Sequence, residues 1–253
     1  MEYCSGGSLQ LPYEAGPLGL PDVRRMSTDV AIGLAAMHAR EMLHRDIKPS
    51  NILSGNSGVT KLGDFGLVTD RLILGYGSAK GYADHVAPEV WTGSPTSAKS
   101  DIWALGMTIY RLLHGATFYA GMPDPVPIVR RGGYANRLKW LPHIPKPWKR
   151  AVRLMLRDDP ADRTPTALAV QNALAGLSTP DWHIDYDPAL VRWTRSQSGR
   201  RVVVEWQRGA VHHWSAWTEP LGLGQKYTLA GSGGDVNAAT ASKQLETFFA
   251  ARG

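Results

Sequence analysis

The chain has 253 residues and a formal net charge of +6 at pH 7, with 43% hydrophobic and 20% charged residues. These values are ordinary for a folded globular protein, and the length allows one large domain and a small one. The single cysteine, Cys4, excludes an internal disulfide, and no apolar run approaches the ~20 residues of a membrane helix. We therefore expect a cytoplasmic protein with no membrane segment in this chain.

The first two thirds of the chain predict a largely helical domain. Apolar residues recur at helical spacing over residues 23–41, which predicts an amphipathic helix. Residues 52–53 and 59–62 are short apolar pieces separated by SGNSG, a pattern typical of a hairpin. Residues 99–113 are apolar nearly all round, which predicts a buried helix.

The following stretch, residues 121–147, is rich in Pro and Gly and is expected to be mostly loop with short helices. Two helices over residues 148–157 and 166–177 close this part of the chain. The positive charge is concentrated here, in clusters such as 130–131 and 146–157. Because charge runs are mostly solvated helix faces, we expect no nucleic-acid partner.

A domain boundary is predicted at residues 178–187, which read as a linker. Beyond it, residues 188–253 predict a small α+β domain of unknown role. Alternating stretches predict three or four strands, over 190–195, 201–207, 212–218 and 226–230, and a helix follows over 237–252. Five tryptophans lie near or within this region, and they fit either ligand stacking or a small core built from large side chains. We favour the core.

Four motifs dominate the sequence. HRDIKPSN covers residues 44–51, DFG covers 64–66, APE covers 87–89, and DIWALG covers 101–106. In this order and at this spacing, they resemble the signature set of eukaryotic-type (Hanks-type) serine/threonine protein kinases. The resemblance implies a mainly α fold: a kinase-like large lobe over residues 1–177, followed by the small α+β domain.

The resemblance also implies chemical roles. Asp46 matches the residue that accepts the proton of the substrate hydroxyl, and Lys48 matches the cation that contacts the transferred phosphate in Ser/Thr kinases. Asn51 and Asp64 match the two ligands of Mg²⁺, a cation that prefers oxygen ligands. ATP and Mg²⁺ are thus the expected cofactors, and a protein with Ser or Thr hydroxyls is the expected substrate.

The start of the chain, MEYCSGGSL, resembles the hinge between kinase lobes. The backbone groups of Glu2 and Cys4 would then face adenine, and Leu53 would form the floor beneath it. Upstream of His44 the sequence holds no recognisable Gly-rich loop, strand Lys or helix Glu of the small lobe. We therefore expect an N-terminally truncated kinase whose small lobe is missing or is supplied by a separate chain.

Further motif residues are expected to be structural or regulatory. Glu89 resembles the APE carboxylate that pairs with a late arginine, here Arg163, and Asp101 resembles the carboxylate that caps the catalytic loop. Arg45 resembles the arginine that binds a phosphorylated activation loop, for which the candidate acceptors are Thr69 and Ser78. The remaining motif positions expected to have such roles are His44, Phe65 and Gly66.

One segment departs from the family pattern. GYADHVAPE aligns with the kinase pattern GTxxYxAPE, so that Tyr82 stands in place of a Thr and His85 in place of a Tyr. This departure affects the expected substrate-binding loop and leaves the catalytic and metal residues in place.

Two hypotheses follow for function. In the first, the protein is a serine/threonine kinase that transfers phosphoryl groups from Mg-ATP. In the second, it is a catalytically inactive kinase lobe that serves as a binding or scaffold module. The presence of Asp46, Asn51 and Asp64 favours the first.

Overall fold

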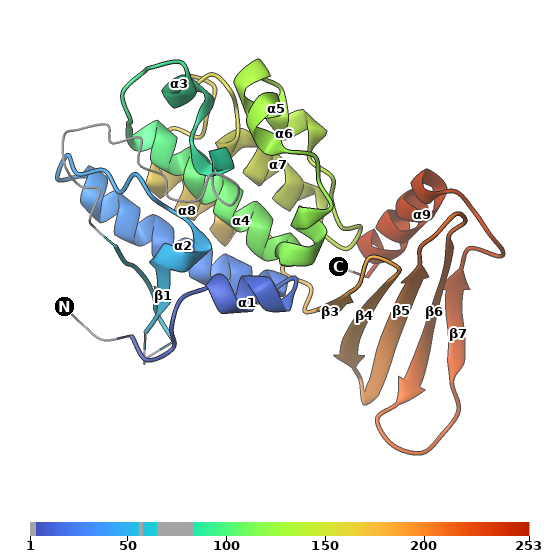
Figure 1. Ribbon diagram of the computed structural model, residues 1–253. Helices are drawn as coiled ribbons and strands as arrows, with labels where there is room; N and C mark the ends of the chain where they lie inside the picture. Colours follow the sequence, from blue (N-terminus) through green and yellow to red (C-terminus); the bar gives the residue numbers. More distant parts are fainter. Residues whose placement is uncertain (1–3, 56–57, 65–82, 253) are drawn as a thin grey trace.

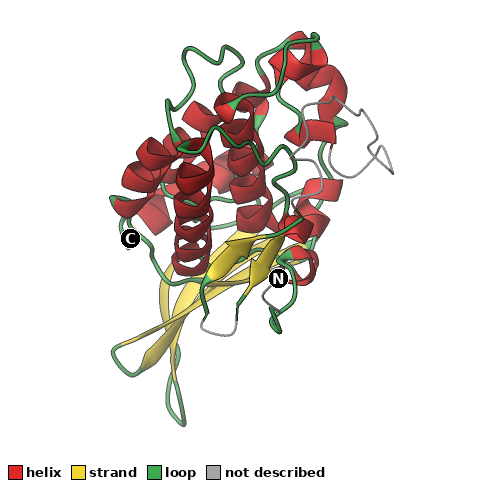
Figure 2. Cartoon of the chain, turned by 90° about the vertical axis from the view of Figure 1, so that its left-hand side faces the viewer, coloured by secondary structure: helices red, strands yellow, loops and turns green. Residues whose placement is uncertain are grey.

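The structure is a computed structural model that describes residues 4–55, 58–64 and 83–252. Figure 1 shows a helical body followed by a C-terminal unit of one sheet and one helix. In both ribbon views the sheet extends away from the helical body (Figures 1 and 2). Among the described helices, none combines the length and apolar composition that crossing a bilayer requires.

The helical body is built around α4, Ala98–Ala120. Its N-terminus is closed by a capping box in which the Ser97 hydroxyl accepts from backbone N–H groups of the first turn. The helix is buried from Ser100 to Gly115, which confirms the apolar helix predicted over 99–113. It continues beyond the prediction through a kink at Gly115, where φ is 74° and ψ is 164°.

The body contains further helices beside α4. They are α1 (Gln10–Ala15), α2 (Leu20–His38), α3 (Pro88–Trp91), α5 (Pro125–Arg131), α6 (Tyr134–Arg137), α7 (Lys146–Met155) and α8 (Ala167–Ala175). Helix α2 confirms the predicted amphipathic helix and begins at Leu20, where Pro21 suits the first helical turn. It packs against α4, α8 and β2. The loop-rich stretch at 121–147 does contain short helices.

Strands β1 (Ile52–Ser54) and β2 (Thr60–Leu62) form the predicted antiparallel hairpin. Short 3-10 helices precede β1 (η1, Pro49–Asn51) and α3 (η3, Ala83–His85). The chain near the N-terminus runs along β1: Leu9 N donates to Ile52 O at 2.8 Å, and Ser54 N donates to Gly7 O at 2.8 Å. These two bonds attach the N-terminal stretch around residues 7–9 to strand β1, which directly follows η1.

The C-terminal unit is an antiparallel meander in the order β3-β4-β5-β6-β7, and helix α9 packs on it. Its elements are β3 (His183–Tyr186), β4 (Leu190–Gln197), β5 (Arg200–Gln207), β6 (His213–Pro220), β7 (Tyr227–Gly231) and α9 (Ala238–Ala250). The prediction of three or four strands was wrong, because β3 lies within the segment 178–187 expected to be a linker. Prolines and aspartates flank this short strand, yet Ile184 is buried and pairs with Trp193.

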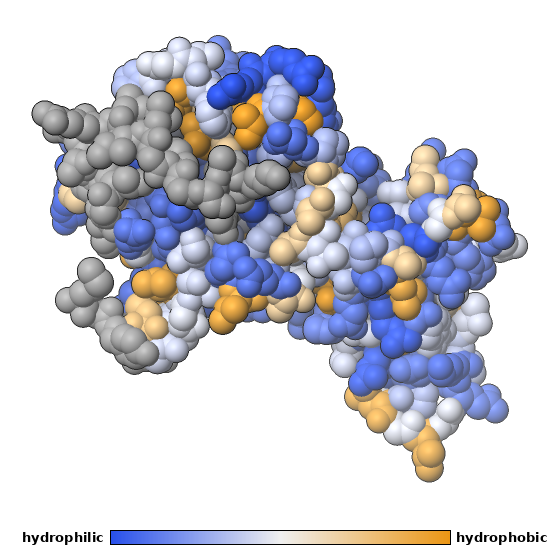
Figure 3. All heavy atoms as spheres, in the orientation of Figure 1, coloured by the Kyte–Doolittle hydropathy of each residue, from blue (hydrophilic) through white to orange (hydrophobic). Residues whose placement is uncertain are grey.

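The core of the C-terminal unit is aromatic. Trp193 and Trp182 both pack against Phe249 of α9, with ring centroids 5.2 and 5.1 Å apart, and Trp214 packs against Phe248 at 5.7 Å. The preference for core packing is confirmed for these three tryptophans, which are all buried. Apolar side chains also reach the surface at the tip of the β6–β7 connection (Figure 3), where Leu221 and Leu223 are exposed.

Candidate active site

The loop that carries HRDIKPSN connects α2 to η1 and lies against the N-terminal turn of α4. The buried carboxylate of Asp101 accepts hydrogen bonds from the backbone N–H groups of His44 at 3.0 Å and Arg45 at 2.8 Å. His38 Nε2 lies 2.9 Å from the same carboxylate. Arg45 has a φ of 68°, an uncommon backbone state for a non-glycine residue, which these contacts hold in place. Asp101 therefore anchors the loop to the central helix.

Three side chains of this loop converge. Lys48 Nζ lies 2.7 Å from Asp46 Oδ2, and Asn51 Nδ2 donates to the same oxygen at 2.7 Å and to the Asp46 carbonyl at 2.9 Å. All three side chains are partly or largely shielded from solvent. The Asp46 carboxylate is thus oriented by a cation and an amide that both contact Oδ2.

The end of the β1–β2 hairpin meets this loop. Gly63 N donates to Asn51 O at 2.8 Å, and His44 Nε2 lies 3.0 Å from Gly63 O. A Cβ at Gly63 would lie 2.8 Å from Leu53 Cδ1, so a larger residue there would have to displace the end of the Leu53 side chain. Asp64, which follows directly, is exposed and has a φ of 57°. The fold therefore bonds Asn51 to Gly63, the residue directly before Asp64.

The residues expected beneath adenine lie on this hairpin and the chain beside it. Leu53 on β1 pairs with Lys61 and forms an isolated bridge with Ser8. Cys4 is half-buried, and its carbonyl accepts from Gly7 N at 3.2 Å. Five other predicted positions lie outside the described residues, as does Tyr82: Glu2, Phe65, Gly66, Thr69 and Ser78.

The segment with the unusual His85 is anchored in the interior. His85 Nδ1 lies 2.8 Å from Ile47 O, so this histidine contacts the loop that carries Asp46. Burial lowers the pKa of His85 to about 4, and its ring is therefore neutral near pH 7. Its neighbour Asp84 is also buried and accepts two hydrogen bonds from Arg111 Nη2, at 2.8 and 3.0 Å.

Sequence reasoning missed the Asp84–Arg111 contact. A signal was present, since Arg111 is a lone charge within the apolar run of α4 and buried charges need partners. The sequence offered no means of choosing Asp84 from among the acidic residues.

Glu89 and Arg163 are brought together, 74 residues apart. Arg163 Nη1 and Nη2 donate to the two carboxylate oxygens of Glu89 at 2.7 and 2.9 Å, in a two-point fork. The guanidinium also donates to the carbonyls of Lys99 and Arg157. This pair ties α3 to the loop between α7 and α8.

The donor chemistry near Asp46 fits a hard cation. Asn51 Nδ2 donates to Asp46, which leaves Oδ1 as the amide atom able to bind a metal. Ser50 Oγ lies 3.4 Å from this oxygen, a long contact. With the Asp64 carboxylate this gives two oxygen ligands of the kind Mg²⁺ uses beside phosphate and water. Among the described residues, no group of three or more His, Cys, Asp or Glu is arranged to hold a metal ion.

Comparison with known proteins places this site in a family context. The family model for the protein kinase domain matches residues 1–174. The chain is 38% identical over 135 residues to MAP kinase kinase skh1/pek1 of Schizosaccharomyces pombe, covering 51% of this chain and 37% of the relative. It is 38% identical over 125 residues to serine/threonine-protein kinase PknL of Mycobacterium tuberculosis, covering 48% and 31%.

A plant relative aligns with a longer part of the chain. Mitogen-activated protein kinase kinase kinase YODA of Arabidopsis thaliana is 34% identical over 177 residues, covering 68% of this chain and 20% of YODA. The matched regions therefore span between a fifth and slightly more than a third of the length of these three relatives.

Proposed function

Because the chain belongs to the protein kinase family, whose domain model matches residues 1–174, we propose that the protein transfers the γ-phosphoryl group of Mg-ATP to Ser or Thr hydroxyls of proteins. The observation that carries this proposal is the convergence of Lys48 Nζ and Asn51 Nδ2 on one oxygen of Asp46, each at 2.7 Å. Phosphoryl transfer depends mainly on positioning and charge neutralisation, and this cluster supplies both.

In the proposed reaction, Asp46 acts as the proton acceptor. The substrate hydroxyl gives its proton to the Asp46 carboxylate as its oxygen forms a bond to the γ-phosphorus. The bond between that phosphorus and the bridging oxygen breaks, and ADP leaves with the electron pair. The fixed orientation of the carboxylate supports this role, because a base must lie within hydrogen-bond reach of the proton that it accepts.

Lys48 and the two proposed metal ligands act on the charge. Lys48 would contact the transferred phosphoryl group as a point charge, and a lysine at this place is a mark of Ser/Thr kinases in the family pattern. Asn51 and Asp64 would hold Mg²⁺ through their side-chain oxygens. Magnesium, when bound, neutralises the phosphate charge that builds up during transfer.

The adenine ring would lie on Leu53, with the backbone near Glu2 and Cys4 as hydrogen-bond partners. The support is the tie between β1 and the N-terminal stretch, which places residues 6–9 along Leu53. The phosphate-covering loop and the Lys–Glu pair of a complete kinase have no match upstream of His44 in this sequence. We propose that residues outside this sequence cover the nucleotide.

Arg45 would regulate the site. Its backbone is fixed by Asp101, and the kinase pattern assigns its side chain to a phosphorylated residue of the activation segment, with Thr69 and Ser78 as the acceptors. The Asp101 anchor and the Glu89–Arg163 pair would keep the loop and the following segment in place during transfer.

The test is a transfer assay with the protein expressed from the longest reading frame that contains this sequence. The protein is incubated with Mg-ATP labelled in the γ-phosphate and a protein substrate rich in Ser and Thr. We expect labelled phosphoserine or phosphothreonine, and a loss of about a hundredfold to ten-thousandfold on Asp46→Asn. Asp185→Asn, at an exposed carboxylate on β3, is the matched control and retains full transfer.

Two results would contradict the proposal. Transfer retained in Asp46→Asn would show that Asp46 is not the base. Absence of transfer in the unchanged protein, together with specific binding to a protein partner, would favour the scaffold module instead.

A further inference from the structure

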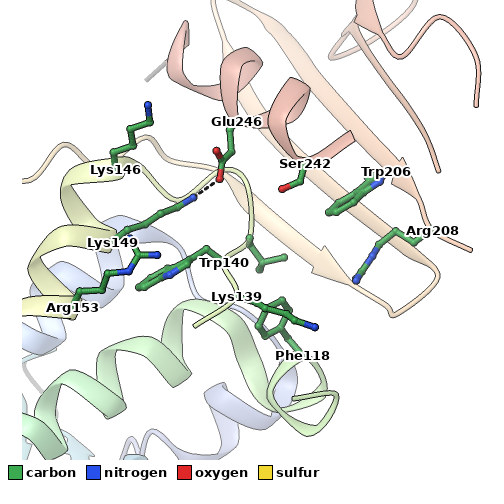
Figure 4. Close-up of a pocket in the computed structure, with 11 residues that line it drawn as sticks. Phe118, Lys139, Trp140, Lys146, Lys149, Arg153, Trp206, Arg208, Ser242 and Glu246 are labelled. Atoms are coloured by element: carbon green, nitrogen blue, oxygen red, sulfur yellow. Dashed lines mark hydrogen bonds and ion pairs between the residues drawn. The ribbon is translucent and has the colours of Figure 1, made fainter. Parts of the chain in front are cut away.

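A cavity lies between the helical body and the C-terminal unit, remote from the Asp46 site. Its volume is about 650 Å³, within the range of small-molecule sites. The wall from the helical body comes from the end of α4, the loop 139–141 and α7, and the opposite wall comes from β5 and α9 (Figure 4). The cavity therefore exists only where the two units meet.

The walls of the cavity are strongly positive. Five cationic side chains and one carboxylate line it: Lys139, Lys146, Lys149, Arg153, Arg208 and Glu246. The buried Lys149 is paired with Glu246 across the junction at 2.6 Å. Beside this pair, the lining holds four further cations and no further acidic side chain. This charge favours an anion with more than one negative charge.

Each wall carries an arginine placed over an indole ring. On the helical body, the guanidinium carbon of Arg153 lies 5.5 Å from the centre of the Trp140 ring. On the C-terminal unit, that of Arg208 lies 4.9 Å from the centre of the Trp206 ring. Figure 4 shows the two pairs on opposite sides of the cavity. Contacts of this kind restrict each guanidinium before a ligand arrives, so less entropy is lost on binding.

We propose that this cavity binds a small organic phosphate that carries a planar ring, a molecule of mononucleotide size. The anionic and polar groups of the ligand are bound by the guanidinium groups of Arg153 and Arg208 on the two walls and by the exposed Lys139. Arginine suits this task because its planar fork matches two phosphate oxygens. The ring lies among the aromatic side chains of the lining, Phe118, Trp140 and Trp206.

Such a ligand would bridge the two units. Arg153 belongs to the helical body and Arg208 to the C-terminal unit, so a ligand that contacts both adds a link beside the Lys149–Glu246 pair. A ligand that binds only the folded, docked protein stabilises it by mass action. The C-terminal unit thereby gains a role as one half of a ligand site.

The test is calorimetric titration of the full chain with guanosine monophosphate, and separately with guanosine and with inorganic phosphate. We expect one saturable site for the monophosphate, and much weaker binding of either component alone. Arg153→Gln and Arg208→Gln are each expected to weaken binding by about tenfold or more. Arg201→Gln, at an exposed cation of β5 outside the lining, is the matched control and leaves affinity unchanged.

Further variants separate this cavity from the proposed ATP site and from folding effects. Leu53→Arg blocks the adenine floor and should leave binding intact, whereas loss of binding in that variant would overturn the proposal. Lys139→Gln, at an exposed position, repeats the test where folding does not depend on the side chain. Equal affinity for the monophosphate in all cavity variants, or no saturable binding to the unchanged chain, would also overturn it.

Discussion

Arg111 of α4 donates through Nη2 to both carboxylate oxygens of Asp84 in the interior of the helical body, at 2.8 and 3.0 Å. The Tyr119 hydroxyl donates to the same carboxylate, and Arg111 Nη1 lies 3.1 Å from the Tyr13 hydroxyl. Burial, and then the Asp84 carboxylate, raise the pKa of Tyr119, so its hydroxyl stays protonated as a donor. The pair fixes η3 against α4 immediately before His85, which contacts the Asp46 loop.

We predict that Arg111→Met lowers the free energy of unfolding by about 3–5 kcal/mol, because it leaves the Asp84 charge buried without its cation. Adding Asp84→Asn to this variant should restore part of the loss, since the amide removes the charge and still accepts from Tyr119. Urea unfolding of the single and double variants measures both effects.

The matched control is the exposed pair of Arg25 and Asp22 on α2, whose nitrogen and oxygen lie 3.2 Å apart. Arg25→Met should cost no more than about 1 kcal/mol, as exposed pairs do. If Arg111→Met cost as little as this control, the buried pair would not hold η3 in place.

Asp101 gives a second prediction, about positioning of the loop that carries Asp46. Asp101→Ala removes the acceptor of two backbone N–H groups and should lower kcat by about a hundredfold through misplacement of Asp46, with KM for ATP little changed. Asp101→Asn keeps one oxygen acceptor and should lose less. Steady-state kinetics of the protein from the longest reading frame separates kcat from KM.

The control for this prediction is Asp124→Ala. The Asp124 side chain also accepts from a backbone N–H, that of Val126 at 3.1 Å, but at the start of α5. Its loss should cost about 1 kcal/mol of stability and no activity. An equal kcat for Asp101→Ala and the unchanged protein would refute the positioning role.

Much of the fold was accessible from the sequence because its signals are local. A long apolar run predicts helix α4, and two short apolar pieces around SGNSG predict the β1–β2 hairpin. The proximity of Asp46, Lys48 and Asn51 is likewise local, since Lys48 follows Asp46 by two positions and Asn51 follows Lys48 by three. Only family resemblance could pair Glu89 with Arg163, 74 residues away.

The rest depends on contacts that no local pattern encodes. Strand β3 has four residues, and only its pairing with β4 distinguishes it from a linker. The cavity between the units joins Arg153 and Arg208, which are distant in sequence, and the charge clusters around residues 146–157 read as solvated surface. Trp206 was expected in the core, and it is buried while also lining this cavity.

A third prediction concerns the kink in α4. At Gly115 φ is 74°, and an added Cβ would lie 2.5 Å from the backbone carbon of Gly16. Gly115→Ala therefore combines backbone strain with a clash and should cost about 3 kcal/mol or more. Gly199 in the β4–β5 turn has a φ of 73° and open space, so Gly199→Ala should cost only about 1–2 kcal/mol. Thermal unfolding compares the stability of the two variants. Equal losses would show that the backbone at Gly16 moves away from the added Cβ at little cost.

The fourth prediction is a loss of stability in mild acid, caused by buried histidines. Burial lowers the pKa of His85 to about 4 and that of His114 and His143 to about 3. In the unfolded chain these histidines have the ordinary pKa of 6.5, so as the pH falls the unfolded chain binds protons before the folded protein does. The free energy of unfolding therefore keeps its full value above about pH 6.5 and falls as the pH drops toward 4 and 3.

Each histidine contributes at most about 1.4 kcal/mol per pH unit to this fall. His143→Gln, which keeps an acceptor for Trp193 Nε1, should therefore flatten the slope by about one such share. Urea unfolding between about pH 6.5 and about pH 5 measures these slopes, and an unchanged slope in His143→Gln would mean that this histidine titrates equally in both states.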